Sequence, residues 1–359
     1  MDRIIVAGSI NMDLVIETDE IPAIGETVAG KAFSTIPGGK GANQAVAIAK
    51  QGGDCIFLGK VGNDDFGANV LKSMQDAGIN TDLIKIENES TGVSIINVDK
   101  TGANNIVYIA GANNLVDENY IDQNKDILDS AKYIVMQNEL PEKTIEHILK
   151  ICKDKKIKTI LNPAPARMIE KDMLELIDIL IPNEHELSRI SGHKVENDED
   201  VRKASEKLLA EGLKEIVVTL GERGVFYKNK DEEKFYDSYK AKVVDTTAAG
   251  DSFIGGFVNV LMQTNDIDKS IDFGQRVAAI AIGKVGAQTS IPTKEEVKEF
   301  DFGGWNGSCI KNAKYQQVFS RREGSWWCAL KCIRWWSHGT SRRKWCGEIH
   351  SNENTFWCL

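Results

Sequence analysis

The stretch DTTAAGDSF, residues 245–253, decides how the rest of the chain is interpreted. Its small residues precede a helix-prone run, which predicts a loop that turns directly into a helix. A helix N-terminus without bulky side chains offers unpaired N–H donors and the positive end of the dipole, so it can hold a phosphoryl group. Asp251 would lie beside that group and could accept a proton from an attacking hydroxyl. Taken alone, the stretch is more typical of an ordinary helix start with Asp251 as a favourable charge.

A second glycine-rich stretch, GGKGANQA at residues 38–45, lies about 200 residues before the first, and the chain opens with GSINMD at residues 8–13. Glycines at this spacing are compatible with a flexible hairpin. The helix-prone residues 42–50 that follow favour a loop that approaches a substrate. Two stretches of this kind, in this order, are far more specific than either alone.

Together these stretches resemble the N-terminal and C-terminal signatures of the ribokinase-like (PfkB) family of carbohydrate kinases, over residues 1–300. The resemblance implies ATP-dependent phosphorylation of D-ribose at the 5-hydroxyl. It implies Asp251 as the base, and the N–H groups of Ala248, Ala249, Gly250 and Asp251 as the anion site. Another sugar or nucleoside kinase of the family, such as a deoxyribokinase or fructokinase, is an alternative. A catalytically silent sugar sensor is a second one, although a sensor has no need of a base.

Composition independently limits the classes of protein. The chain has 359 residues, of which 42% are hydrophobic, and this is enough for one large α/β domain or two ordinary ones. The net charge of −9 argues against a nucleic-acid partner, because such surfaces are basic. No run of residues has the length of a membrane span, and the acidic Asp2 stands where a signal peptide is basic. We therefore expect a cytoplasmic protein with no membrane partner.

The body of the chain alternates segments of strand and helix character. Apolar or β-branched runs predict strands, and spacing near 3.6 predicts helices. The predicted strands are 3–7, 55–60, 133–137, 159–162, 179–182 and 215–220, and the predicted helices are 43–51, 66–77, 142–153, 201–211, 252–262 and 267–284. This order predicts an α/β fold with a mainly parallel central sheet and helices on both faces. Ligands of such sheets lie at the carboxyl ends of the strands.

Two segments interrupt that alternation, residues 13–33 and 91–109. The second has the pattern of two antiparallel strands around residues 99–102. The resemblance implies that both segments form a small antiparallel β lid that closes over the sugar. It also implies a homodimer formed through this lid.

Asn11 and Asp13 follow the first predicted strand, where a ligand is expected. Sugar hydroxyls are best held by carboxylates and amides, although both residues are also typical of an Asx turn. The resemblance adds further sugar ligands, which are Gly39, Lys40, Asn43 and Glu139. Lys40 would reach the phosphoryl group, with a solvated lysine as the alternative. For Glu139 the alternative is a place near a helix N-cap.

The sequence NEHE at residues 183–186 resembles the N-x-x-E motif of the family. Asn183 would lie beside the nucleotide and Glu186 would help to hold hydrated Mg²⁺. The alternative is a helix that begins at an Asn with acidic residues in its first turn. The sequence TLGERG at 219–224 follows a predicted strand and would bring Thr219, Gly221 and Gly224 toward ATP.

A monovalent cation site, for K⁺, is implied by the resemblance alone. Its residues would be Asp245, Thr247, Val285, Gly286 and Ser290. The cation would order the phosphate-binding loop.

Residues 301–359 differ sharply in composition from the rest. They hold all seven Trp and five of the seven Cys, and nine Lys/Arg against four Asp/Glu. Neither helical nor strand periodicity is visible, and Cys328 and Cys332 lack the second pair that a zinc site needs. We expect an aberrant tail that packs poorly. A Cys/Trp-rich binding appendage, or a scaffold built on it, is the alternative.

The amino-acid sequence of this tail indicates its origin. Back-translation of residues 335–359 with a one-nucleotide shift permits a sequence that contains the P-loop pattern G-x-x-x-x-G-K-S. The same shift from Trp305 permits a sequence that resembles the start of an ABC-transporter ATPase. Our hypothesis is that the tail is the following gene of an operon, translated out of frame. Sequencing the transcript around codon 300 tests it.

Removal of residues 301–359 is expected to leave kinase activity intact and to improve solubility, because every sugar and nucleotide motif lies before Pro292. The measurement compares the specific activity and the soluble yield of the full chain with those of a chain that ends at Phe300. Loss of activity or of folding on truncation would show that the tail belongs to the domain.

Overall fold

The computed structural model describes residues 3–300, 310–311, 318–322 and 325–329. Its largest sheet runs through the body of the chain, and neighbouring strands are parallel from β12 to β4. The two strands β13 and β14 continue the sheet in antiparallel fashion at one edge. In residues 3–300 the order is β14 (Glu233–Tyr236), β13 (Val225–Asn229), β12 (Glu215–Thr219), β11 (Ile179–Leu180), β10 (Lys158–Asn162), β9 (Ala131–Gln137), β1 (Arg3–Ala7) and β4 (Cys55–Leu58). The prediction of a mainly parallel central sheet is confirmed.

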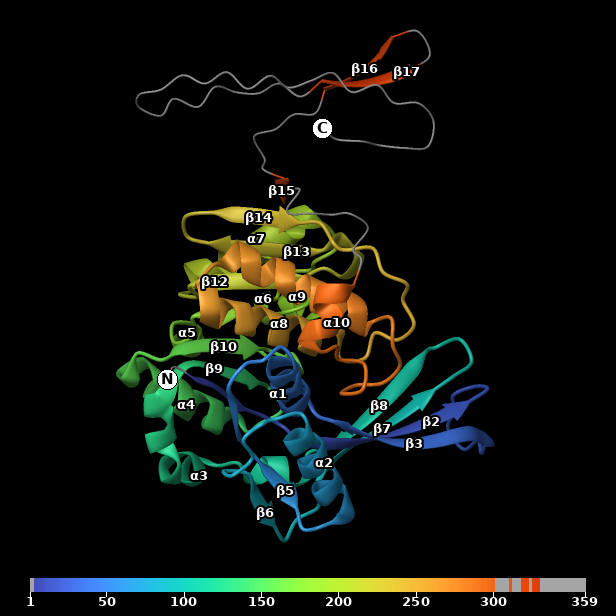
Figure 1. Ribbon diagram of the computed structural model, residues 1–359, viewed down its shortest axis with the longest axis vertical. Helices are drawn as coiled ribbons and strands as arrows, with labels where there is room; N and C mark the ends of the chain where they lie inside the picture. The colour runs from blue at the N-terminus through green and yellow to red at the C-terminus, as the bar shows by residue number, and fades with distance from the viewer. Residues whose placement is uncertain (1–2, 301–309, 312–317, 323–324, 330–359) are drawn as a thin grey trace. The chain divides into compact units, whose positions relative to one another are not determined.

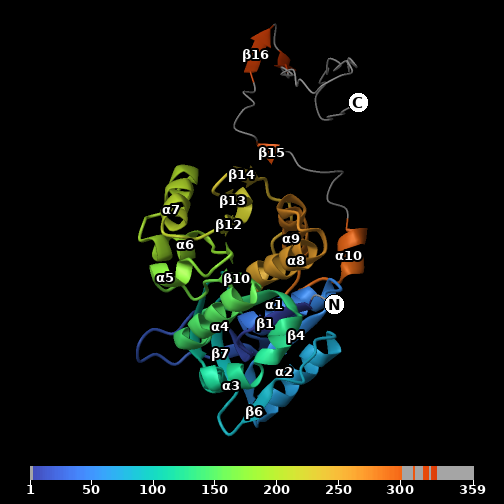
Figure 2. The same cartoon turned by 90° about the vertical axis from the view of Figure 1, so that its left-hand side faces the viewer.

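Helices cover both faces of this sheet, as Figure 2 shows for its upper half. Successive side chains of a strand point to opposite faces, so Ile5 packs in one apolar layer while Ile4 and Val6 pack in the other. One face carries α3 (Glu118–Gln123), α4 (Glu142–Lys155), α5 (Lys171–Leu174), α6 (Glu184–Ser191) and α7 (Asp198–Ala210). The other carries α1 (Lys40–Lys50), α2 (Asp65–Asp76), α8 (Ala249–Thr264) and α9 (Ile267–Ala281), and α10 (Lys294–Glu299) packs on α9.

The predicted helices and strands are present, with shifted ends. Helix α1 begins at Lys40 and not at residue 43, because Gly39, with φ 90°, turns the chain directly into the helix. Helix α9 ends at Ala281 and not at residue 284. The predicted strand 55–60 is divided at Gly59 into β4 and the short β5 (Lys60–Gly62), which pairs with β6 (Lys85–Glu87).

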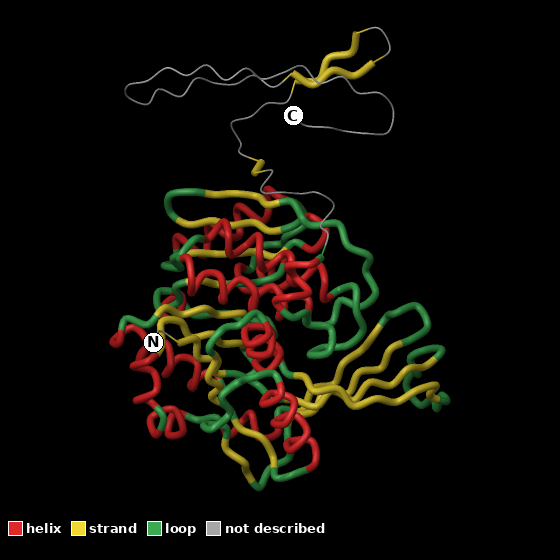
Figure 3. Tube along the Cα trace, in the orientation of Figure 1, coloured by secondary structure: helices red, strands yellow, loops and turns green. Residues whose placement is uncertain are grey.

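The lid forms a separate four-stranded sheet that projects from the body, as Figures 1 and 3 show. Its order is β3 (Gly30–Gly38), β2 (Asn11–Thr18), β7 (Gly92–Val98) and β8 (Asn104–Ile109). The pairs β2–β3 and β7–β8 are antiparallel, as expected, whereas the central pair β2–β7 is parallel. Strand β8 is an edge strand, and its Ile106 and Val107 are exposed. Three short 3₁₀ segments complete the body, at Gly111–Leu115, Lys125–Ser130 and Gly221–Arg223.

Beyond residue 300 the structure describes three short strands. These are β15 (Ile310–Lys311), β16 (Val318–Arg322) and β17 (Ser325–Ala329), and β16 pairs with β17 in antiparallel fashion. Our sequence analysis found no strand periodicity here. Aromatic and β-branched residues favour strands even without alternation, and both strands contain them. The other expectations for residues 301–359 fall on residues outside those that the structure describes.

Tertiary contacts divide the chain into two units, Met1–Ile310 and Lys311–Leu359. Among the residues described, no helix is both long enough and apolar enough to span a membrane.

Helices α1 and α8 pack closely because a glycine stands at their contact. A Cβ at Gly255 of α8 would lie 2.2 Å from the Cβ of Ala47 in α1. A shorter side chain than alanine is therefore required at this position. The contact fixes α1, which contains the end of the stretch 38–45, against α8, which begins within the stretch 245–253.

Gly255→Ala is expected to lower the free energy of unfolding by about 1–3 kcal/mol, because an overpacked contact forces the helices apart. Denaturant unfolding measures this. Gly30→Ala in β3 is the matched control, since its new Cβ would meet atoms no closer than 3.6 Å, and it is expected to change stability by less than about 0.5 kcal/mol. Equal effects of the two substitutions would contradict the packing argument.

Candidate active site

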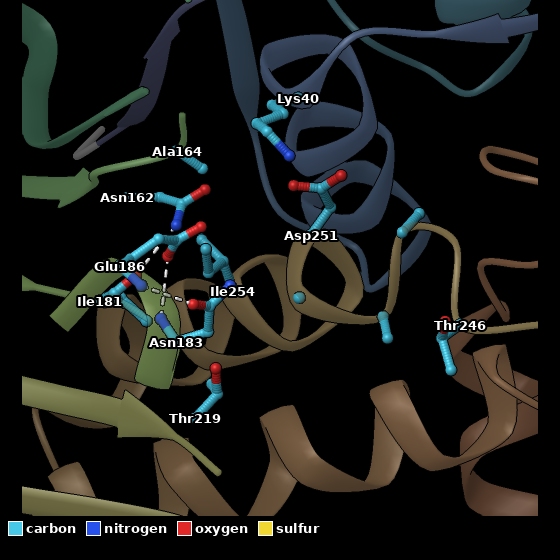
Figure 4. A pocket seen from close by; sticks show the side chains of 13 residues that line it. Lys40, Asn162, Ala164, Ile181, Asn183, Glu186, Thr219, Thr246, Asp251 and Ile254 are labelled. Atoms are coloured by element: carbon cyan, nitrogen blue, oxygen red, sulfur yellow. Dashed lines mark hydrogen bonds between the residues drawn. The ribbon is translucent and has the colours of Figure 1, made fainter. Parts of the chain in front are cut away.

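The N-termini of α1 and α8 meet at the carboxyl edge of the main sheet. Figure 4 shows Lys40, on the first turn of α1, pointing toward Asp251 on the first turn of α8. The carboxylate of Asp251 is only 7% exposed. Its Oδ2 accepts from Asn43 Nδ2 at 3.1 Å and its Oδ1 accepts from Gln44 Nε2 at 3.0 Å. One carboxylate is thus held by two neutral donors and faces one ammonium group.

A pocket opens beside this pair. It is lined by Lys40, Asn162, Ala164, Ile181, Asn183, Glu186, Thr219, Thr246, Ala248, Ala249, Gly250, Asp251 and Ile254 (Figure 4). The structure therefore brings the predicted phosphate loop together with Asn183, Glu186 and Thr219. Lys40 and Asp251 line the pocket on the side of the other residues predicted to bind sugar.

The start of α8 has the character predicted for an anion site. Ala248 is in the left-handed conformation with φ 57°, and no side chain caps the helix. The N–H of Ala249 donates to the carbonyl of Thr246 at 3.2 Å, so this one donor of the predicted four is already engaged. Within the described residues, the N–H groups of Gly250 and Asp251 have no hydrogen-bond partner. They remain available to an anion in the pocket.

The predicted sugar ligands lie around the start of α1 and the base of the lid. Asn11 and Asp13 are in β2, and both are buried. Asn113 donates from Nδ2 to Asn11 Oδ1 at 2.8 Å, which orients the amide of Asn11. The Oδ1 atom of Asn43 is buried and has no partner among the described residues. A ligand hydroxyl is the kind of donor that such an atom lacks.

Glycines keep this region open. A Cβ at Gly38 would lie 2.2 Å from Asp13 Oδ2, and one at Gly39 would lie 2.7 Å from the backbone nitrogen of Asn11. Glu139, after β9, accepts from the hydroxyl of Ser9 and from the backbone N–H of Lys40 at 3.2 Å. Glu139 therefore joins the first strand to the start of α1.

Charge is concentrated here. The pKa of Asp13 is raised to about 6, first by burial and then by the nearby Glu139 and Asp251, while a hydrogen bond from Ser94 and the charge of Lys40 act in the opposite direction. Burial also raises the pKa of Glu139, although Lys40 opposes this. Burial alone would lower the pKa of Lys40, but the surrounding carboxylates, first Asp251 and then Glu139, raise it above its ordinary value. Lys40 is therefore a cation held between carboxylates.

Asn183 and Glu186 form a capping box at the start of α6. Glu186 N–H donates to Asn183 Oδ1 at 2.8 Å, and Asn183 N–H donates to Glu186 Oε2 at 2.8 Å. Burial raises the pKa of Glu186. Asn183 and Glu186 therefore both start a helix and line the pocket, so the two interpretations of this motif are compatible.

Of the stretch TLGERG at 219–224, only Thr219, the last residue of β12, lines the pocket. Gly224 has φ 89°, and a Cβ there would lie 1.9 Å from the carbonyl oxygen of Tyr236. The need for glycine at 224 comes from the approach to β14. Gly221 has φ 58° and open space around it, so its requirement is conformational.

The residues predicted to hold a monovalent cation lie in two loops that Asp245 connects. Its Oδ1 accepts from the N–H and the hydroxyl of Thr247, at 2.8 and 2.6 Å, and its Oδ2 accepts from Gly286 N–H at 2.9 Å. Burial alone would raise the pKa of Asp245, but these hydrogen bonds bring it below its ordinary value. Val285 is 70% exposed, and Ser290 donates its hydroxyl to the Ala287 carbonyl at 2.8 Å.

Sequence reasoning missed several residues that shape this centre. Gln44 and Asn162 are buried beside Asp251, Ser9 holds Glu139, and Asn113 holds Asn11. Gln44 belongs to the stretch GGKGANQA, so its position was visible. A lone buried Gln or Asn carries no other signal in a sequence.

Comparison with known proteins shows the family of this chain. The family described as "pfkB family carbohydrate kinase" matches residues 1–294. The chain belongs to this pfkB family. A ribokinase of Haemophilus influenzae is 38% identical over 296 residues, which cover 82% of this chain and 97% of that protein. A deoxyribokinase of Salmonella typhi is 36% identical over 299 residues, which cover 83% of this chain and 98% of that protein.

A solved pfkB-family neighbour is a ribokinase of Arabidopsis thaliana complexed with ribose and ATP. It has a TM-score of 0.79 and 30% identity, and the match covers 84% of this chain and 100% of that one. The predicted ribokinase-like fold is therefore confirmed.

The buried Asp13 makes a stability prediction for this pfkB kinase. Because its pKa is raised, the folded state disfavours the carboxylate, so the stabilising effect of the neutral form is present below the unfolded pKa of 3.8 and is lost as pH rises through about 6. Asp13→Asn is therefore expected to stabilise the ligand-free protein by about 2–3 kcal/mol near pH 8, and by about half as much near pH 5.

Urea unfolding at the two pH values measures this difference. Glu17→Gln in the same strand is the control, because the Glu17 side chain is exposed, and it is expected to change stability little at either pH. A destabilised Asp13→Asn protein at the higher pH would contradict the assignment of a strained carboxylate.

Proposed function

We propose that this chain is an ATP-dependent kinase that phosphorylates D-ribose at its 5-hydroxyl, giving ribose 5-phosphate. One observation carries the proposal. Asp251 lies at an uncapped helix start, with free N–H donors beside it, and shares its pocket border with Lys40. A ribokinase relative at 38% identity, and a second ribokinase at 30% identity solved with ribose and ATP, support the choice of substrates.

The reaction follows from these positions. Asp251 accepts the proton of the sugar hydroxyl as its oxygen attacks the terminal phosphorus of ATP. The N–H groups of Gly250 and Asp251, at the positive end of α8, face the negative charge that spreads over the phosphoryl oxygens. Lys40 adds a positive charge on the sugar side. The proton passes to Asp251, the phosphoryl group passes to the 5-oxygen as its bond to the bridging oxygen of ATP breaks, and ADP leaves.

The sugar is placed by buried polar side chains in this proposal. Asn43 Oδ1 is buried and accepts nothing within the described part of the chain, so it is suited to a sugar hydroxyl. Asp13 and Glu139 are carboxylates that lose solvation in the folded state, so a donor hydroxyl compensates both. Asn11, Gly39 and Lys40 complete the proposed sugar site.

ATP occupies the side of Asn183, Thr219, Gly221 and Gly224 in this proposal. Glu186 would help to hold Mg²⁺ beside the phosphates, where the ion neutralises charge during transfer. The residues fit such an ion, since Glu186 lines the pocket with Asp251 and its Oε1 makes no hydrogen bond within the described part of the chain. No described group of three His, Cys, Asp or Glu side chains could bind a metal alone. Phosphate and water would therefore supply most ligands, as Mg²⁺ prefers.

Potassium would order the phosphate loop. The donor set fits a monovalent cation, because Asp245 stays ionised by hydrogen bonding and joins the Thr247 loop to the Gly286 loop. Val285 and Ser290 belong to the second of these loops. Ordering these loops would position the start of α8.

We also propose a cytoplasmic location, a kinase domain of residues 1–300 and a functionless tail. The family match, which ends at residue 294, supports this boundary. A homodimer formed through the lid is proposed as well. The exposed apolar side chains of its edge strand β8, Ile106, Val107 and Ile109, support it.

Deoxyribose is the second candidate substrate, because the deoxyribokinase relative is 36% identical over a similar length. ATP consumption across a panel of pentoses and hexoses tests both. A kcat/KM for ribose above that for 2-deoxyribose and fructose supports the first proposal, and the opposite order replaces it.

Asp251→Asn is expected to lower turnover by about 10²–10⁴-fold while ribose and ATP still bind, because the shape is kept and the base is removed. Steady-state kinetics and calorimetric titration measure the two effects. Asp266→Asn is the matched control, since asparagine also caps a helix and Asp266 only caps α9 and pairs with Lys269. Turnover near that of the unaltered protein in Asp251→Asn would remove Asp251 from the mechanism.

A further inference from the structure

Three buried amide side chains form a continuous hydrogen-bonded chain that ends on Asp251. We call Gln137, Gln44 and Asn162 the amide chain. Gln137 Nε2 donates to Gln44 Oε1 at 2.7 Å, and Gln44 Nε2 donates both to Asp251 Oδ1 at 3.0 Å and to Asn162 Oδ1 at 3.1 Å. Gln44 and Gln137 are fully buried.

The direction of this chain is fixed at one end. Asn162 Nδ2 donates to the backbone carbonyl of Ile181 at 2.9 Å, and a carbonyl can only accept. Asn162 must therefore turn its oxygen toward Gln44. Gln44 must then present its NH₂ group, whose two hydrogens are divided between Asn162 and Asp251. The donor from Gln137 on Gln44 Oε1 keeps the same orientation.

The amide chain also connects the elements of the site. Gln137 and Asn162 are the last residues of the neighbouring strands β9 and β10, and Gln44 is on α1. Asp251 is on α8. Gln44 thus connects the carboxylate at the start of α8 to the carboxyl edge of the main sheet.

We infer that Gln44 is a positioning residue for the phosphoryl-transfer reaction. Its Nε2 holds Asp251 Oδ1, so that Oδ2 stays turned toward Asn43 and the sugar side. This inference rests on the proposed function, because it assigns a role to Gln44 only through Asp251 as the base. Gln44 itself does not line the pocket.

A double-mutant cycle tests this. Gln44→Met keeps the approximate length and volume of the side chain and removes its amide, which donates to Asp251 and Asn162 and accepts from Gln137. Its kcat is expected to fall about 10–100-fold, with the KM values for ribose and ATP changed less than about threefold. In the Asp251→Asn background the same substitution is expected to change the residual kcat by less than about twofold, because nothing remains for Gln44 to position.

Gln51→Met is the matched control. Gln51 follows the same helix α1, is equally buried and makes one side-chain hydrogen bond, to the Pro292 carbonyl at 2.7 Å, without touching Asp251. It is expected to lower Tm, because a buried carbonyl loses its donor, and to leave kcat within about twofold. Equal losses of kcat in both variants would reduce Gln44 to a structural residue and overturn the inference.

The remaining outcomes are also decisive. Equal losses of kcat from Gln44→Met in both backgrounds would show that Gln44 does not act through Asp251. An Asp251→Asn protein with full turnover would overturn the proposed function, and the inference with it. Where Gln44→Met fails to fold, Gln137→Met replaces it, since it removes the donor that supports the orientation of the Gln44 amide and removes no donor to Asp251. A smaller loss of kcat, absent in the Asp251→Asn background, is then expected, and no loss would overturn the inference.

Discussion

Helices α1 and α8 touch at Gly255, where a hydrogen atom alone fits against Ala47, and this contact brings together residues that lie 207 positions apart. Near their N-termini the same two helices share the hydrogen bonds from Asn43 and Gln44 to Asp251. The site is therefore a consequence of helix packing as well as of the loops that precede each helix. A shift of one helix would separate Asp251 from both of its donors at once.

The charge at this junction explains why the centre is built around one lysine. Asp13, Glu139 and Asp251 all lie close enough to Lys40 to raise its pKa, while burial acts in the opposite direction. Three carboxylates without that cation would repel one another in a region of low solvation. Lys40 thus permits the carboxylates to gather before any sugar or nucleotide binds. Unpaired polar atoms such as Asn43 Oδ1 remain for the ligand to satisfy.

The sequence predicted the main sheet because parallel strands buried on both faces leave long apolar runs, as at residues 133–137 and 215–220. It could not predict the parallel pairing of β2 with β7, since periodicity within a strand does not name its neighbour. The signature stretches predicted that Asn43 and Asp251 belong to the site. Gln44 and Asn162 were missed because a buried amide has no pattern of its own, and its role depends on which carbonyl or carboxylate the fold places opposite it.

Asn183 and Glu186 show why the structural and functional interpretations of a short motif need not exclude each other. The capping box uses Glu186 Oε2 on the N–H of Asn183, and the same carboxylate lines the pocket. Side chains that satisfy the free N–H groups of a helix start are the oxygen-bearing residues that also suit Mg²⁺ and phosphates. A cap moreover fixes the rotamer of Glu186, so that a metal or its waters would meet a carboxylate that is already oriented. The motif that starts α6 thereby pre-organises the proposed nucleotide side of the pocket, just as the packing of α1 against α8 pre-organises the proposed sugar side.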